Sequence, residues 1–155
     1  MKFLATLLTL AATASAVDLY LHVDNDCGSS GFRCTSIGPN SCCGTISNNS
    51  PYQSVSVRDI QQLWNIQCLG YDGGMCNRRR TISDYTGGDF ICNRSNGFRY
   101  TGVEYRSLGW ERATGSSASA LKEEEEECQR PDALVLGDGS EFDLAGLSDE
   151  EFDAL

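Results

Sequence analysis

The stretch VDLYLHVDN, residues 17–25, alternates between apolar and polar side chains. Its odd positions up to 23 carry valine or leucine, and its even positions carry aspartate, tyrosine or histidine. Successive side chains of a β-strand point to opposite faces of the sheet. The stretch therefore predicts a half-buried strand with one apolar face, and it places His22, the only histidine of the chain, on the polar face.

Similar stretches recur along the chain at intervals of about ten residues. They are YQSVSVRDI, LWNIQCLGYDGG, GGDFICN and FRYTGVEYRSL, and turn-rich stretches such as IGPNSCCG separate them. Short strands at this spacing predict a mainly β fold, either a small sandwich or a Greek-key arrangement. Residues 57–64 also fit helical spacing, and a short helix capped by Ser56 is the alternative for this stretch.

The first sixteen residues, MKFLATLLTLAATASA, have the composition of an export signal. Lys2 supplies a positive start, an apolar run follows, and the small residues Ala14 and Ala16 suit cleavage after position 16. The apolar run is shorter than the roughly 20 residues that cross a bilayer, and no later segment is apolar enough to do so. We expect residues 1–16 to be removed as a signal peptide and the mature chain to be secreted and extracellular.

Eight cysteines remain after this cleavage: Cys27, Cys34, Cys42, Cys43, Cys68, Cys76, Cys92 and Cys128. In an oxidising compartment, an even number of cysteines predicts a disulfide framework. Four bridges of about 2–4 kcal/mol each would rival the whole stability of a small domain. The adjacent Cys42 and Cys43 point to opposite faces of an extended chain, so we expect them to bond two different partners. The sequence leaves the pairing otherwise open.

Charge divides the chain into two parts. Residues 17–120 hold nine acidic and nine basic side chains, whereas residues 121–155 hold thirteen acidic and two basic ones. We expect a cysteine-rich β domain over residues 17–113, a flexible linker over 114–121 and an acidic, largely disordered tail over 122–155. The neutral domain lacks the general basic surface of a nucleic-acid-binding protein.

The tail contains two features that a purely solvating segment would lack. Cys128 follows a run of five glutamates, and the domain before it holds seven cysteines, so one of them needs a partner. We expect Cys128 to bridge back to the domain in a monomer, and a covalent dimer is the alternative. Ser148 and Glu151 have the spacing of a capping box, which predicts a short helix start near the C-terminus.

The segment SVSVRDIQQLWNIQCLGYDGG resembles the βγ-crystallin pattern of a serine-led strand followed by an aromatic corner. Ser54, Trp64, Tyr71 and Gly74 stand at the matching positions. The resemblance implies a small β-sandwich. The calcium-binding pattern of that family is not intact in NSPYQS, residues 49–54, so the resemblance implies no calcium site.

In its overall design, the chain is similar to the small secreted cysteine-rich proteins of filamentous fungi, which combine a signal peptide with several disulfides. Many of these act as effectors or toxins, including virulence factors. The resemblance implies a non-enzymatic binding protein that acts outside the producing cell on a protein or glycan of a host or competitor.

Catalytic, cofactor and metal sites are not apparent. The single histidine has no recognisable triad around it, and the chain has neither a Cys-x-x-Cys pair nor a cofactor motif. We therefore predict no catalytic, cofactor-binding or metal-ligating residues. Two alternatives stay open: a small secreted hydrolase of glycan or RNA that uses domain carboxylates, and a covalently linked extracellular structural protein.

Recognition is expected to use charged and aromatic surface residues. Arg78, Arg79 and Arg80 interrupt the neutral domain, and they are interpreted as an anion-contact patch, with a dibasic processing site or an exposed loop as the alternatives. The five glutamates before Cys128 are a candidate partner for them. Tyr100 and Tyr105 are candidate exposed aromatics.

Two sequence motifs predict glycosylation of a secreted chain. Asn48 and Asn93 each begin an Asn-x-Ser acceptor motif without proline in the middle. Both lie in stretches that are predicted to be turns. We therefore expect a glycoprotein.

Overall fold

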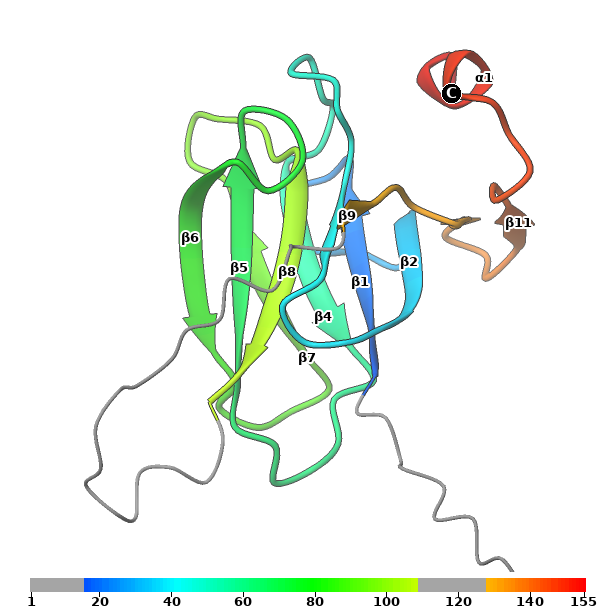
Figure 1. Cartoon of the computed structure of the whole chain (residues 1–155). Coiled ribbons are helices and arrows are strands. Elements are labelled where there is room, and N and C mark those ends of the chain that lie inside the picture. The colour runs from blue at the N-terminus through cyan, green and yellow to red at the C-terminus, as the bar shows by residue number, and fades with distance from the viewer. Residues whose placement is uncertain (1–15, 109–127) are drawn as a thin grey trace, which may run out of the picture.

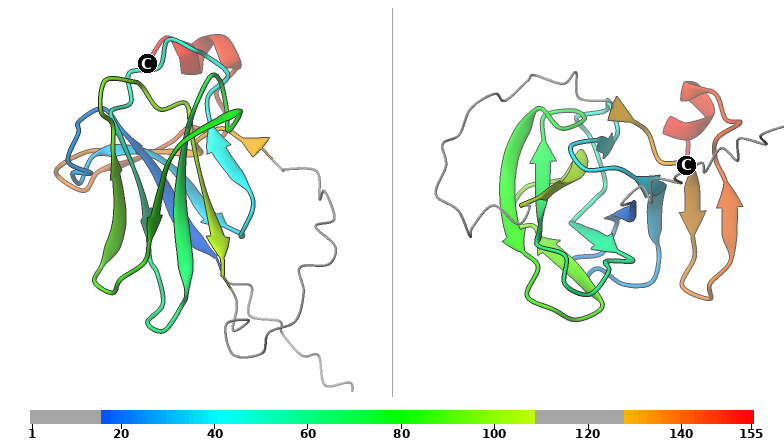
Figure 2. Two further views of the ribbon diagram at one scale, coloured as in Figure 1. Left: turned by 90° about the vertical axis from the view of Figure 1, so that its left-hand side faces the viewer. Right: turned by 60° about the horizontal axis from the view of Figure 1, so that its bottom comes forward.

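The computed structural model describes residues 16–108 and 128–155. Two antiparallel-rich sheets pack face to face, and one short helix follows near the C-terminus (Figures 1 and 2). The strands and helix are β1 (Val17–His22), β2 (Gly31–Ile37), β3 (Cys42–Gly44), β4 (Ser54–Arg58), β5 (Ile66–Asp72), β6 (Arg78–Asp84), β7 (Phe90–Arg94), β8 (Gly102–Ser107), β9 (Cys128–Gln129), β10 (Ala133–Val135), β11 (Glu141–Asp143) and α1 (Asp149–Asp153). The predicted mainly β, disulfide-stapled sandwich is confirmed.

The strand order shows how distant segments meet. The first sheet has the order β11-β10-β2-β1-β4-β7, and the second has the order β6-β5-β8-β3-β9. Strands β6 and β7 are therefore edges of two different sheets. In the described part of the chain, no helix is long and apolar enough to cross a membrane.

The core lies between the sheets and consists of the alternating apolar residues that the sequence pattern identified. Leu19, Leu21, Val55 and Val57 from the first sheet are fully buried, as is Val103 from the second. Because every second residue of these strands points inward, alternation in the sequence becomes a continuous apolar layer. Residues 57–64 form no helix: β4 continues through Arg58, and a turn with positive φ then leads towards β5.

Strands β1 and β4 are buried on their outer face as well. The loop between β1 and β2 folds back over this face, and a disulfide joins its Cys27 to Cys92 of β7. Arg58 of β4 anchors this loop by two hydrogen bonds, because its guanidinium donates to the carbonyl oxygens of Cys27 at 2.8 Å and Gly28 at 2.9 Å. The prediction that His22 lies on an exposed polar face is therefore wrong: the residue is fully buried under this loop.

Six of the eight cysteines form disulfides, and these are Cys27–Cys92, Cys34–Cys43 and Cys42–Cys76. The adjacent Cys42 and Cys43 bond different partners, as the opposite-face argument predicts. The fourth bridge of the expected framework is not formed, and Cys68 is a buried thiol.

Strand order explains why Cys68 and Cys128 do not meet. Strands β8 and β3 lie between β5, which carries Cys68, and β9, which carries Cys128. Three strand spacings amount to about 14 Å, whereas a disulfide needs Cα atoms within about 7 Å. The expected tether by a bridge from Cys128 is replaced by strand pairing, since β9 runs parallel to β3 with Cys128 opposite Cys42.

The acidic tail is more ordered from Cys128 onward than its composition suggests. Strand β10 pairs with β2, and β11 pairs with β10 as a hairpin. The predicted capping box is present, because the Ser148 side chain accepts from the Glu151 backbone and the Glu151 side chain accepts from the Ser148 backbone. Leu144 and Phe152 are buried against the main core, which offsets the cost of ordering an acidic segment. The expected linker, residues 114–121, and the glutamate run lie outside the described residues.

Candidate functional site

The arginine triplet stands at the start of β6, the edge strand of the second sheet, rather than in a loop. Arg78 and Arg80 share one carboxylate, Asp72: Arg78 Nε lies 2.6 Å from its Oδ1, and an Arg80 nitrogen lies 3.3 Å from its Oδ2. The hydrogen bond from Arg78 holds the pKa of Asp72 below its usual value. Arg79 is exposed and, among the described residues, forms no ion pair.

An open trough of about 520 Å³ runs between the edges β6 and β7. Arg80 lies on the β6 side of the trough, and its guanidinium carbon is 4.6 Å from the centre of the Phe98 ring. Arg94 is exposed at the end of β7 and lies on the opposite side of the trough. Among the described residues, no aspartate or glutamate forms an ion pair with Arg94. The lining of the trough therefore has a net positive charge.

The floor of the trough is a polar layer that joins the two sheets. Thr81 Oγ1 lies 3.0 Å from the Tyr100 hydroxyl, and the Ser83 hydroxyl donates to the Asn93 side chain. The amide nitrogen of Asn93 donates in turn to the Cys68 carbonyl at 3.1 Å. Asn93 is therefore buried and its amide nitrogen is already bonded, and glycosylation at this position stays a prediction. Asn48, the other acceptor, is exposed.

The thiol of Cys68 lies beneath this layer. It is fully buried, and burial raises the pKa of the thiol. A protonated, inaccessible thiol is neither a nucleophile nor a metal ligand. In the described residues, no group of three or more histidine, cysteine, aspartate or glutamate side chains could hold a metal ion.

The two tyrosines that were expected to be exposed recognition residues are both buried. Tyr100 is 0% exposed and Tyr105 is 1% exposed. The Tyr100 hydroxyl contacts Thr81, which lines the trough, and burial raises the pKa of Tyr100 to about 12. Accessible aromatic surface next to arginine lies instead at Phe90, whose ring is 4.7 Å from the Arg58 guanidinium carbon.

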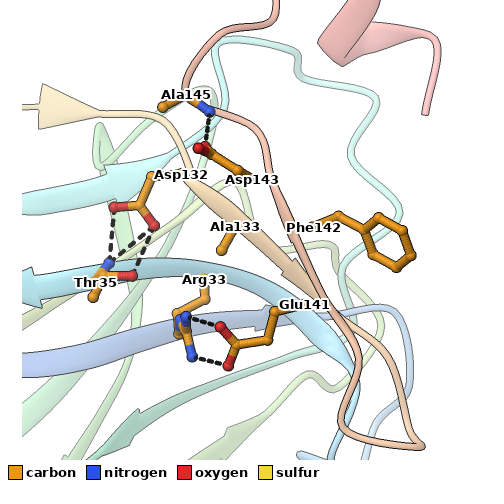
Figure 3. Close-up of a pocket in the computed structure, with 8 residues that line it drawn as sticks. All are labelled: Arg33, Thr35, Asp132, Ala133, Glu141, Phe142, Asp143 and Ala145. Atoms are coloured by element: carbon orange, nitrogen blue, oxygen red, sulfur yellow. Dashed lines mark hydrogen bonds and ion pairs between the residues drawn. The ribbon is translucent and has the colours of Figure 1, made fainter.

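A second surface lies along β2, where the domain meets the tail (Figure 3). Two guanidinium nitrogens of Arg33 donate to the two carboxylate oxygens of Glu141, both at 2.8 Å. The carboxylate of Asp132 accepts from the backbone and hydroxyl of Thr35. An open cavity of about 440 Å³ lies between these contacts and β11.

Above β2, the tail helix covers an apolar groove of the domain. Phe152 of α1 packs edge-on against Phe32, with ring centres 5.7 Å apart, and Phe32 packs against Tyr52 at 5.5 Å. A cavity of about 360 Å³ remains between this helix and the loop before β4.

These features define a small, disulfide-stapled β-sandwich domain with a docked acidic tail. Several disulfides of this kind fit an extracellular or secreted protein, where an oxidising environment preserves them. The chain belongs to the family ARB_05566_N, whose model, described as an N-terminal domain, matches residues 18–132. No curated protein matches the chain, and no solved structure does. The likeness to the βγ-crystallin pattern stays a resemblance of sequence.

Proposed function

We propose that this protein is a secreted, non-enzymatic, effector- or toxin-like binding protein that recognises an acidic glycan of a host or competitor in the β6–β7 trough. The observation that supports the proposal most directly is the pair of arginines, Arg80 on β6 and Arg94 on β7, on the two sides of an open and otherwise uncharged trough. Carboxylate or sulfate groups of a glycan would supply the missing anions.

The chemistry of the trough suits a sugar polymer. Its floor carries the hydroxyl oxygens of Thr81 and Ser83, which can accept from sugar hydroxyls. The trough lies between two strand edges, so a linear chain can run along it. Arginine forks provide paired donors to planar carboxylates.

Rigidity of the trough supports a binding role. Cys92 lines the trough and is bonded to Cys27, which ties β7 to the loop over the first sheet. On the β6 side of the trough, an ion pair with Asp72 and a cation–π contact with the Phe98 ring fix the Arg80 guanidinium. A site that is already ordered loses less conformational entropy on binding.

The test measures binding of polygalacturonate and heparin to the purified secreted chain, with neutral dextran as the reference. The double change Arg80→Gln and Arg94→Gln should weaken binding about tenfold, since exposed charge pairs contribute up to about 1 kcal/mol each. The control Arg106→Gln changes an arginine on β8 that does not line the trough, and it should keep the affinity. Equal affinity of the double variant and the unaltered protein, or release of reducing ends from the glycan, would contradict the proposal.

A further inference from the structure

The cavity of about 360 Å³ between α1 and the loop before β4 has walls from two distant parts of the chain. Phe32 of β2 and Tyr52 of the loop belong to the domain, whereas Phe152 lies on α1 and Leu155 follows it. Ligand pockets in proteins begin at about 300 Å³ and are lined mainly by apolar and aromatic side chains with a few polar groups. This cavity therefore has the size of a site for one small molecule.

The charge of the lining separates this cavity from the trough and from the cavity beside β11. The trough contains Arg80 and Arg94, and the cavity beside β11 contains Arg33 with three acidic side chains. Among the described residues that line the cavity at α1, none has a charged side chain, although the chain holds 12 basic and 22 acidic ones. A charged ligand would lose its hydration there without gaining a partner of opposite charge. The lining therefore fits an uncharged ligand.

Three of the lining residues are aromatic, and their rings pack on one another. The Phe32 ring meets the rings of Tyr52 and Phe152 edge-on, with ring centres 5.5 Å and 5.7 Å apart. All three residues are buried, so packing fixes the orientation of the rings. A further aromatic ring gains from the same edge-to-face geometry, beyond the apolar area that it buries. The rings therefore favour an aromatic ligand over an aliphatic one.

Apolar side chains that remain exposed also line the cavity. Val23, directly after β1, is 51% exposed, and Leu155, two residues after α1, is 64% exposed. A ligand in contact with them would remove apolar surface from water, which is favourable.

Polar groups of the lining are uncharged and can bind a hydroxyl group. The Ser47 hydroxyl accepts from the Asn49 backbone at 3.3 Å, which leaves its own proton for a ligand. Asn49 is exposed, and its side-chain amide can both donate and accept.

We propose that this cavity binds an uncharged aromatic small molecule with a hydroxyl group, of the aryl alcohol or phenol class. Its ring lies against Phe32 and Phe152, and its hydroxyl group bonds to Ser47 and Asn49. Because the domain and α1 both contribute walls, the complete site exists only while α1 is docked. Ligand binding therefore stabilises the docked helix.

The first experiment titrates the purified protein with naphthylmethanol by isothermal calorimetry, and we expect a dissociation constant of about 0.1 mM. Two matched compounds test the chemical class. Naphthoate has the same rings and a negative charge, and decahydronaphthylmethanol has the same hydroxyl group and no aromatic ring. Both should bind more weakly than naphthylmethanol. Absence of naphthylmethanol binding at about 1 mM, or equal or tighter binding of either matched compound, overturns the proposal.

Two substitutions place a carboxylate in the lining, one from each part of the chain. Val23→Asp and Leu155→Asp both alter half-exposed side chains, so each variant should fold and should bind naphthylmethanol at least about fivefold more weakly. The matched control Leu63→Asp alters an apolar residue that is 94% exposed and does not line the cavity, and it should keep the affinity. Unchanged affinity in a folded Val23→Asp or Leu155→Asp variant overturns the proposal.

Hydrogen exchange then locates the bound ligand. The Phe152 amide donates to the Ser148 carbonyl at 3.0 Å, and the Leu155 amide donates to the Phe152 carbonyl at 3.2 Å, so exchange of both requires local opening. With naphthylmethanol at about ten times its dissociation constant, this exchange should slow about tenfold. An unchanged exchange rate with the ligand bound would place it elsewhere and would overturn the proposal.

Discussion

The hydroxyl oxygen of Ser56 lies 2.8 Å from Nε2 of His22, in the interior of the molecule. On the other side of the ring, Nδ1 lies 2.6 Å from the carbonyl oxygen of Ser30. A carbonyl can only accept, so Nδ1 carries the proton and Nε2 accepts from Ser56. The only histidine therefore holds β1, β4 and the covering loop together in its neutral form.

This arrangement predicts that stability falls as the pH is lowered from 6.5. Burial lowers the pKa of His22 below its ordinary value of 6.5, so the unfolded chain binds a proton that the folded chain rejects. Stability is then lost from pH 6.5 downward until the folded pKa is reached, with a slope of at most about 1.4 kcal/mol per pH unit. Urea unfolding at pH 7 and pH 5.5 measures the loss. In His22→Gln the loss over this interval should disappear, and an unchanged loss would show that other groups cause it.

The position of Cys68 gives a second prediction, about thiol reactivity. Its sulfur lies in the core, and burial raises the thiol pKa, so the reactive thiolate is scarce in the folded protein. Iodoacetamide at pH 8 should leave Cys68 unmodified in the native protein and modify it in 6 M guanidinium chloride. Peptide mass mapping identifies the site. Rapid labelling of native Cys68, or its recovery in a disulfide, would contradict the structure.

The sequence predicts those strands in which the order of apolar and polar residues along the strand itself matches which side chains are buried. Strands β1, β4 and β8 alternate because one face packs on the opposite sheet. Strand β6 reads RRRTISD and was not expected as a strand, because most of its residues are exposed and no apolar period marks it. The burial of His22 was missed because the loop that covers it is held by Cys92, a residue far along the chain.

The candidate site was only half visible in the sequence. Three consecutive arginines predict a cationic patch from the sequence alone. Arg94 and Phe98 join that patch because edges of two different sheets lie side by side, and no local signal records this. The short tail helix was found because a capping box is a local motif. Its docking through Phe152 was not found, because Phe142 stands in the same tripeptide.

The three disulfides should differ in how much they stabilise the domain. They close loops with sequence separations of 65 for Cys27–Cys92, 34 for Cys42–Cys76 and 9 for Cys34–Cys43. In the loop-entropy model these correspond to about 4.3, about 3.8 and about 2.6 kcal/mol. Guanidinium unfolding of the three paired Cys→Ala variants should rank them in this order. A larger loss for the Cys34–Cys43 pair than for Cys27–Cys92 would show that packing, rather than chain entropy, sets their contributions.

Gly70 on β5 lies directly against Tyr100 of the core and Thr81 of the trough. A methyl group at this position would meet the Tyr100 ring and the hydroxyl of Thr81, which lines the trough. Overpacking of a tight interior costs about 1–3 kcal/mol, so Gly70→Ala should lower the free energy of unfolding by that amount. It should also weaken glycan binding, because the Thr81 hydroxyl and the Tyr100 ring that contacts it must move.

Gly38 provides the matched control for this substitution. A methyl group there has no atom within 4 Å, and Gly38→Ala should change stability by less than about 0.5 kcal/mol. Urea denaturation of both variants, followed by glycan titration at a temperature where both are folded, separates the two effects. If Gly70→Ala unfolds like the unaltered protein, the close approach of Tyr100 to β5 is not the constraint that the structure indicates. If it loses stability but binds normally, the trough does not depend on the position of Tyr100.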